Sequence, residues 1–96
     1  MKTFDLEIIT PEETVFKGQT HSLIVPAYFG YLGIMAGHAP FICGLSNGKA
    51  IVRRPEGDVF VAINGGFMET TPQKTVILAD EAKILKSNLT GTGRDS

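Results

Sequence analysis

VFVAINGGFMETTPQKTVILAD, residues 59–80, decides the fold class of this chain, because it contains short apolar strands separated by turn residues. Apolar runs of four to eight residues that are rich in Val, Ile and Phe are typical of β-strands. TPQK (71–74) predicts a tight turn, and the glycine pair in Asn64-Gly65-Gly66 permits either a turn or a β-bulge. The stretch therefore predicts consecutive strands with no helix between them.

The rest of the chain repeats this pattern. TFDLEII (3–9) alternates strictly, with Phe4, Leu6 and Ile8 on one face. Further strands are predicted at 15–18, 21–25, 40–45 and 49–54, with hairpin turns at SNGK (46–49) and PEGD (55–58). About nine short strands at this spacing indicate an all-β fold, either a β-sandwich or a barrel.

Composition and charge exclude several classes of protein. The 96 residues suffice for one domain, and a net charge of -1 gives no excess of Lys and Arg for binding nucleic acid. No charged side chain lies between Lys17 and Lys49, but Pro26, Pro40 and several glycines interrupt this segment, which argues against a membrane-spanning helix. Cys43 is the single cysteine and the N-terminus has no signal-peptide pattern, so we expect a cytoplasmic setting.

Two strands are apolar on both faces, at residues 59–63 and 76–79. An antiparallel sheet normally exposes one face to water, and a chain this short cannot cover both faces with its own core. We therefore expect part of this surface to lie against a partner or a terminal helix. DEAKILKSNL (80–89) is predicted to form such a helix from Asp80, followed by a frayed end.

The sequence contains no catalytic or metal-binding motif, and no cofactor is expected. His21, His38 and Cys43 occur in no H-x-x-x-H or C-x-x-C spacing, and no phosphate-binding loop is present. Cys43 lies in the apolar run FICG, which is typical of a small buried residue. His38 has no neighbour in sequence that would orient it, which favours a structural or interface role. A small enzyme built on His38 and Cys43 is the alternative.

The segment AYFGYLGIM (27–35) is typical of an interaction loop, since it concentrates aromatic residues and Met between glycines. Alternation predicts that Leu32 and Ile34 point inward and that Phe29 and Tyr31 point outward. A ligand-binding β-sandwich would use the same aromatic side chains.

Three segments together resemble the N-terminal β-sandwich domain of the epsilon subunit of F-type ATP synthase. They are LEIITPEETVFKG (6–18), GYLGIMAGHAPF (30–41), and INGGFMET (63–70) followed by TVILADEA (75–82). The similarity runs in order from about Phe4 to Lys83 and covers most of the chain.

This resemblance implies a sandwich of two roughly five-stranded sheets over residues 1–83, and a short helical or disordered tail over residues 84–96. It implies a non-catalytic rotor subunit of the central stalk. Such a subunit binds the gamma subunit and the c-ring, contacts the catalytic alpha/beta hexamer only indirectly, and couples proton flow to ATP synthesis. It is peripheral, at the cytoplasmic face of the bacterial inner membrane.

The resemblance also implies the roles of individual residues. Phe29, Gly30, Tyr31, Leu32 and Gly33 correspond to the c-ring-facing loop, and Thr10, His38 and Cys43 fall where the family faces gamma. GIMAGHAP (33–40) is then a coupling turn, whose path the glycines permit.

The chain departs from the family at two positions and in length. Ala36 replaces a common proline, and Tyr31 replaces a small acidic or polar residue. Most bacterial members continue into an inhibitory two-helix hairpin, so we expect a short form without it. A free-standing β-sandwich that binds a ligand or another protein is the alternative.

Overall fold

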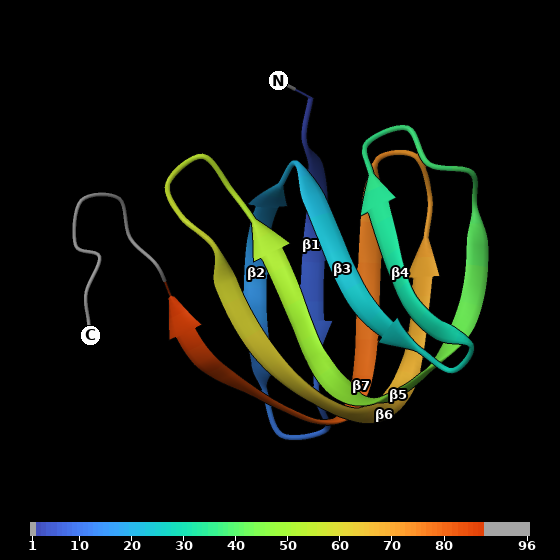
Figure 1. The fold of residues 1–96 in the computed structure, drawn as a ribbon, viewed down its shortest axis with the longest axis vertical. Helices are drawn as coiled ribbons and strands as arrows, with labels where there is room; N and C mark the ends of the chain where they lie inside the picture. Colours follow the sequence, from blue (N-terminus) through green and yellow to red (C-terminus); the bar gives the residue numbers. More distant parts are fainter. Residues whose placement is uncertain (1, 88–96) are drawn as a thin grey trace.

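The computed structural model describes residues 2–87, which form an all-β domain of seven strands (Figure 1). The strands are β1 (Phe4–Ile9), β2 (Thr14–Thr20), β3 (Ser22–Ala27), β4 (Gly30–Met35), β5 (Phe41–Arg53), β6 (Val59–Thr70) and β7 (Lys74–Ser87). No helix that is long and apolar enough to cross a membrane is found within residues 2–87.

All seven strands belong to one hydrogen-bonded sheet in the order β2-β1-β7-β6-β5-β3-β4. The sheet is mixed, because β1 runs parallel to β7 while the other neighbouring pairs are antiparallel. The division into two separate five-stranded sheets stays a prediction.

The three long strands bend at a common level. The ladder between β5 and β6 passes from Leu45↔Gly66 to Asn47↔Asn64. The ladder between β6 and β7 passes from Gly66↔Ala79 to Asn64↔Glu81. Ser46, Gly65 and Asp80 are therefore left out side by side, and Figure 1 shows the three strands curving strongly so that the sheet closes over its own inner face.

The hairpin turn predicted at SNGK was wrong, and of the two alternatives at Asn64-Gly65-Gly66, a turn or a bulge, the structure excludes the turn. SNGK lies inside β5, and Asn64-Gly65-Gly66 lies inside β6, where the chain bends without reversing. Both segments continue to pair with neighbouring strands before and after the bend. Their backbone N–H and C=O groups therefore find partners without a reversal of the chain. The turns predicted at PEGD and TPQK are confirmed, since they connect β5 to β6 and β6 to β7.

The short helix expected from Asp80 was also wrong within the described residues. Residues 81–87 continue β7 and pair with the first half of β6, from Glu81↔Asn64 to Ser87↔Val59. Pairing along β6 overrides the local helical preference of this segment. The remainder of the predicted tail, residues 88–96, lies outside the described residues.

The inner face of the curved sheet encloses one hydrophobic core. Strict alternation in β1 buries Phe4, Leu6 and Ile8, as predicted. The largest fully buried apolar side chains are Leu6, Ile8, Leu23, Ile34, Met68, Ile77, Val25, Val52 and Val61. Thr70 and Thr75, which flank the last turn, bury their hydroxyl groups against each other at 2.7 Å.

Candidate interaction surfaces

Three large apolar side chains stand exposed on the outer face of adjacent strands. Ile42 on β5, Phe67 on β6 and Leu78 on β7 are 68%, 63% and 55% exposed. Phe67 and Leu78 are directly opposite each other in the ladder, and Ile42 lies two positions from Gly44, the β5 partner of Phe67. We call Ile42, Phe67 and Leu78 the strand patch. Isolated exposed apolar residues are ordinary, but a contiguous group rimmed by polar residues is typical of a binding surface.

The strand patch follows from the two-residue period of the strands. Cys43, Met68 and Ile77 form one cross-strand row that points into the core. The side chains one position away must then point outward. Ile42, Phe67, Val76 and Leu78 are apolar at these positions, while Glu69 is acidic and Gly44 has no side chain. Leu78 belongs to one of the two strands predicted to be apolar on both faces, whereas Ile42 and Phe67 lie outside both. That a partner covers this surface stays a prediction.

Shallow grooves extend the strand patch in both directions. One groove is lined by Ile9, Thr10 and Pro11 together with Phe67 and Leu78. Others join Ile42 to Glu69 and Val76, and to Pro40, Phe41 and Thr71. The charged residues in these linings are Glu69 and Asp80, so the apolar surface has an acidic rim.

The predicted gamma-facing residues lie around or behind this patch. Thr10 lines one of its grooves, and the Thr10 hydroxyl exchanges hydrogen bonds of 3.2 Å with the backbone of Glu13. The half-buried ring of His38 stands edge-on to Phe41, with 5.1 Å between ring centroids. Cys43 lies on the core side of β5, and burial raises its pKa. A raised pKa disfavours the thiolate, so the structure gives no support to Cys43 as a nucleophile.

A second exposed group forms the hairpin between β3 and β4. Tyr28 and Phe29 are 72% and 59% exposed and contact each other edge-to-face, with ring centroids 5.0 Å apart. Gly30 follows them with φ of 128°, a conformation that favours glycine. We call residues 28–30 the hairpin tip.

The predicted split between inward and outward residues in this hairpin is confirmed. Ile34 is buried and Leu32 packs against the core, while Phe29 and Tyr31 are exposed. A Cβ atom added to Gly33 would have no other atom within 4 Å. The structure adds a contact that the sequence did not predict: the Lys49 amide donates a hydrogen bond to the Tyr31 hydroxyl at 3.2 Å.

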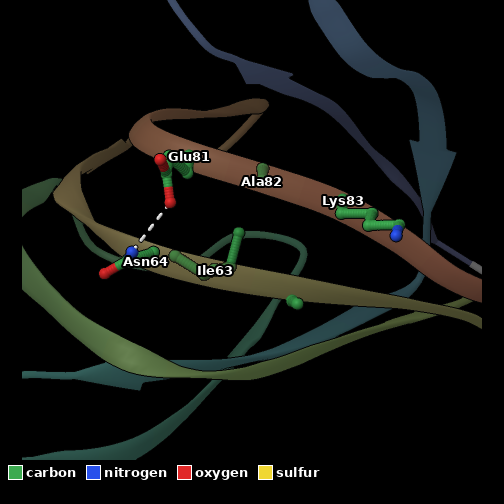
Figure 2. Close-up of a pocket in the computed structure, with 6 residues that line it drawn as sticks. Ile63, Asn64, Glu81, Ala82 and Lys83 are labelled. Atoms are coloured by element: carbon green, nitrogen blue, oxygen red, sulfur yellow. Dashed lines mark hydrogen bonds between the residues drawn. The ribbon is translucent and has the colours of Figure 1, made fainter.

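A separate hollow lies between the first half of β6 and the second half of β7. Figure 2 shows Asn64 and Glu81 facing each other across it, and the Asn64 amide donates to a Glu81 carboxylate oxygen at 2.9 Å. Ala62, Ile63, Ala82 and Lys83 complete the lining. Within residues 2–87, no three His, Cys, Asp or Glu side chains gather as a metal site.

Comparison with known proteins identifies the family. Residues 3–84 match the family described as "ATP synthase, Delta/Epsilon chain, beta-sandwich domain". The chain belongs to this family. Among its relatives, the ATP synthase epsilon chain of Moorella thermoacetica is 44% identical over 84 residues, covering 86% of this chain and 63% of the relative. The epsilon chain of Propionigenium modestum, described as sodium ion specific, is 39% identical, covering 90% of this chain and 63% of the relative.

Solved structures show the same fold. A chain of the Euglena gracilis mitochondrial ATP synthase, in a structure of OSCP, F1 and c-ring, superposes with a TM-score of 0.79 at 21% identity, over 85% of this chain and 53% of that one. A chain in the central stalk and c-ring structure of the Tetrahymena thermophila enzyme gives a TM-score of 0.67 at 13% identity, over 85% of this chain and 66% of that one. The present chain spans 63% of the length of the two bacterial epsilon chains.

Proposed function

We propose that this chain is a non-catalytic epsilon subunit of the central stalk of an F-type ATP synthase, which couples proton flow to ATP synthesis. The observation that carries the proposal is the strand patch, an apolar surface on the domain that matches the epsilon family. The structural neighbours come from complexes that contain F1 and the c-ring. A domain with this role needs two separate contact surfaces and a stiff body between them.

The strand patch is the proposed contact with the gamma subunit. It lies beside Thr10, continues through Phe41 toward His38, and is backed by Cys43. Thr10, His38 and Cys43 are the three positions that the family resemblance assigns to gamma. Buried aromatic and aliphatic anchors contribute most of the free energy of such interfaces. The acidic rim formed by Glu69 and Asp80 favours a gamma surface that carries Lys or Arg around an apolar centre.

The hairpin tip and the residues after it are the proposed contact with the c-ring. The loop Phe29 to Gly33 contains no charged residue, and its exposed aromatic pair offers a large contact area with few rotatable bonds. The catalytic alpha/beta hexamer would be reached only through gamma. The domain would then lie at the cytoplasmic face of the bacterial inner membrane without entering it.

The body between the two surfaces is the proposed two-layered sandwich. The common bend at Ser46, Gly65 and Asp80 divides each long strand, so one layer contains β2, β1 and the halves of β7, β6 and β5 nearest the strand patch. The other layer contains the remaining halves with β3 and β4. Each layer then has five strand segments around a shared core, and close packing makes the body stiff enough to transmit torque.

Gel filtration of the chain with a gamma-containing catalytic complex tests this function. We expect co-elution at one copy per complex for the wild-type chain. Phe67→Asp should abolish co-elution, because it places a charge at the centre of the interface. Leu85→Asp is the matched control, since Leu85 is also exposed, at 51%, but lies at the far end of β7. A folded wild-type chain that elutes alone would contradict the proposal.

A further inference from the structure

The Tyr31 side chain reaches past β3 to contact β5, in addition to exposing its aromatic ring. Tyr31 is opposite Pro26 in the ladder between β4 and β3, and β3 separates β4 from β5. The Tyr31 hydroxyl nevertheless accepts a hydrogen bond from the backbone amide of Lys49 on β5, at 3.2 Å. This hydrogen bond therefore links the edge strand β4 directly to β5, which is not its neighbour in the sheet.

The bond occurs where the ladder between β3 and β5 is interrupted. Pairing runs regularly from Ser22↔Arg53 to Ile24↔Ile51 and resumes only at Ala27↔Leu45. The β5 residues between Leu45 and Ile51 therefore have no register partner on β3. Lys49 lies in this gap, and the Tyr31 hydroxyl takes the place of the missing strand acceptor.

Gly48 creates the space for this contact. A Cβ atom on Gly48 would lie 2.7 Å from the Tyr31 hydroxyl oxygen and 2.7 Å from Cβ of Pro26. Pro26 and Tyr31 thus close over the same glycine. Three elements meet here: the edge hairpin, the interrupted part of β3, and the bend of β5.

We propose that Tyr31 is a positioning residue, whose hydroxyl ties the β3–β4 hairpin to β5 and so fixes the direction in which Tyr28 and Phe29 meet the c-ring. This inference rests on the proposed function for its partner. β4 is an edge strand, with a ladder on one side only. The Tyr28 amide at the start of the tip donates to the Gly44 carbonyl of β5 at 3.0 Å, and the Tyr31 hydroxyl adds a second link to β5 directly after the tip. With both sides of the tip linked to β5, its rotation away from the body is restricted.

The first test measures the bond in the isolated full chain. Tyr31→Phe removes one oxygen atom and keeps the ring, and we expect hydrogen exchange at the Lys49 amide to become about five- to tenfold faster. Tyr28→Phe is the matched control, because the described residues give the Tyr28 hydroxyl no hydrogen-bond partner. In that variant the Lys49 exchange rate should stay within about twofold of wild type.

The second test measures the role in docking. In a complex with gamma, Tyr31→Phe should lower the affinity for purified c-ring about three- to tenfold, while the affinity for gamma stays unchanged. A general loss of structure would weaken both contacts, so the difference between them reports positioning.

The outcomes are separable. Unchanged Lys49 exchange overturns the bond, and faster exchange with full c-ring affinity overturns the positioning role. If the wild-type complex does not bind c-ring at all, the proposed function fails and the docking role fails with it. If Tyr31→Phe keeps both wild-type properties while the wild type binds c-ring, the proposed function stands and this inference is wrong.

Discussion

The strand patch and the hairpin tip are both exposed and apolar, but the fold holds them in different ways. Phe67 and Leu78 stand on strands that are paired on both sides, and Ile42 stands on β5, which pairs at that position with β6 alone. All three are backed by a buried row. Tyr28 and Phe29 stand on a turn beside an edge strand. Contacts built on paired strands are rigid, whereas contacts built on loops are adjustable. The comparison indicates a rigid contact at the strand patch, and at the hairpin tip a contact whose geometry depends on how the turn is linked to the body.

The largest expected effect comes from breaking the bend below the strand patch. Gly66 has φ of 124°, and an added Cβ would overlap the carbonyl oxygen of Leu78 and lie 2.7 Å from Cα of Ala79. Both obstacles are backbone atoms, which cannot rotate away. Gly66→Ala should therefore lower the free energy of unfolding by more than about 3 kcal/mol, measured by urea denaturation, and abolish gamma binding.

Gly33→Ala is the matched control for this change. Gly33 has nothing within 4 Å of an added Cβ, and its φ lies outside the positive range. The free energy of unfolding should change by less than about 0.5 kcal/mol. Equal effects of the two substitutions would mean that the bend at Gly66 relaxes, and the rigid attachment of the strand patch would lose its structural basis.

Phe67→Ala should separate binding from stability. Its side chain is 63% exposed, so truncation should change the free energy of unfolding by less than about 1 kcal/mol. As the central residue of the proposed gamma contact, it should nevertheless weaken gamma binding by about 2 kcal/mol, or roughly thirtyfold, in a titration of purified gamma complex. Unchanged gamma affinity would remove the strand patch from the interface.

Phe29→Ala should give the opposite pattern with a smaller magnitude. Loss of the exposed ring and its contact with Tyr28 should weaken c-ring binding by about 1 kcal/mol, roughly fivefold, and leave gamma binding unchanged. The tip is a local contact that loses one of two aromatic rings, which is why the effect is smaller. A parallel loss of gamma affinity would show that the two surfaces are not independent.

Much of the fold could be predicted from the sequence, because strand alternation is a local property. The inward direction of Ile34 and the outward directions of Phe29 and Tyr31 followed from it. The turn predicted at Gly48 was wrong, and the choice between a turn and a bulge at Gly65 was left open, because a glycine permits both and only pairing with neighbouring strands decides between them. For the same reason, the strand conformation after Asp80 was not visible in its own residues.

The candidate site was predictable only in part. Strands apolar on both faces predicted an exposed apolar surface that includes Leu78, but not that Ile42 and Phe67 lie beside it, since the register between strands brings them together. The bond from Lys49 to Tyr31 joins residues eighteen positions apart and depends on an interruption in a third strand. No local pattern reports such a contact.

The smallest expected effect on stability concerns Cys43, which lies directly behind the strand patch. Burial raises the pKa of its thiol, so at pH 8 less thiolate forms than in an exposed cysteine. Alkylation by iodoacetamide should be at least about tenfold slower than at a cysteine placed at exposed Ser46 in a Cys43→Ser background.

The same shift gives a weak pH dependence of stability with a defined sign. The folded state holds the Cys43 proton more tightly than the unfolded state, so its contribution is complete below the pKa of the unfolded thiol and falls as the pH rises through the folded pKa. The free energy of unfolding should decline at alkaline pH by a margin that Cys43→Ser removes. Fast alkylation of the folded wild-type chain at pH 8 would mean that β5 opens readily. The strand patch would then be as adjustable as the hairpin tip, and the contrast between the two surfaces would fail.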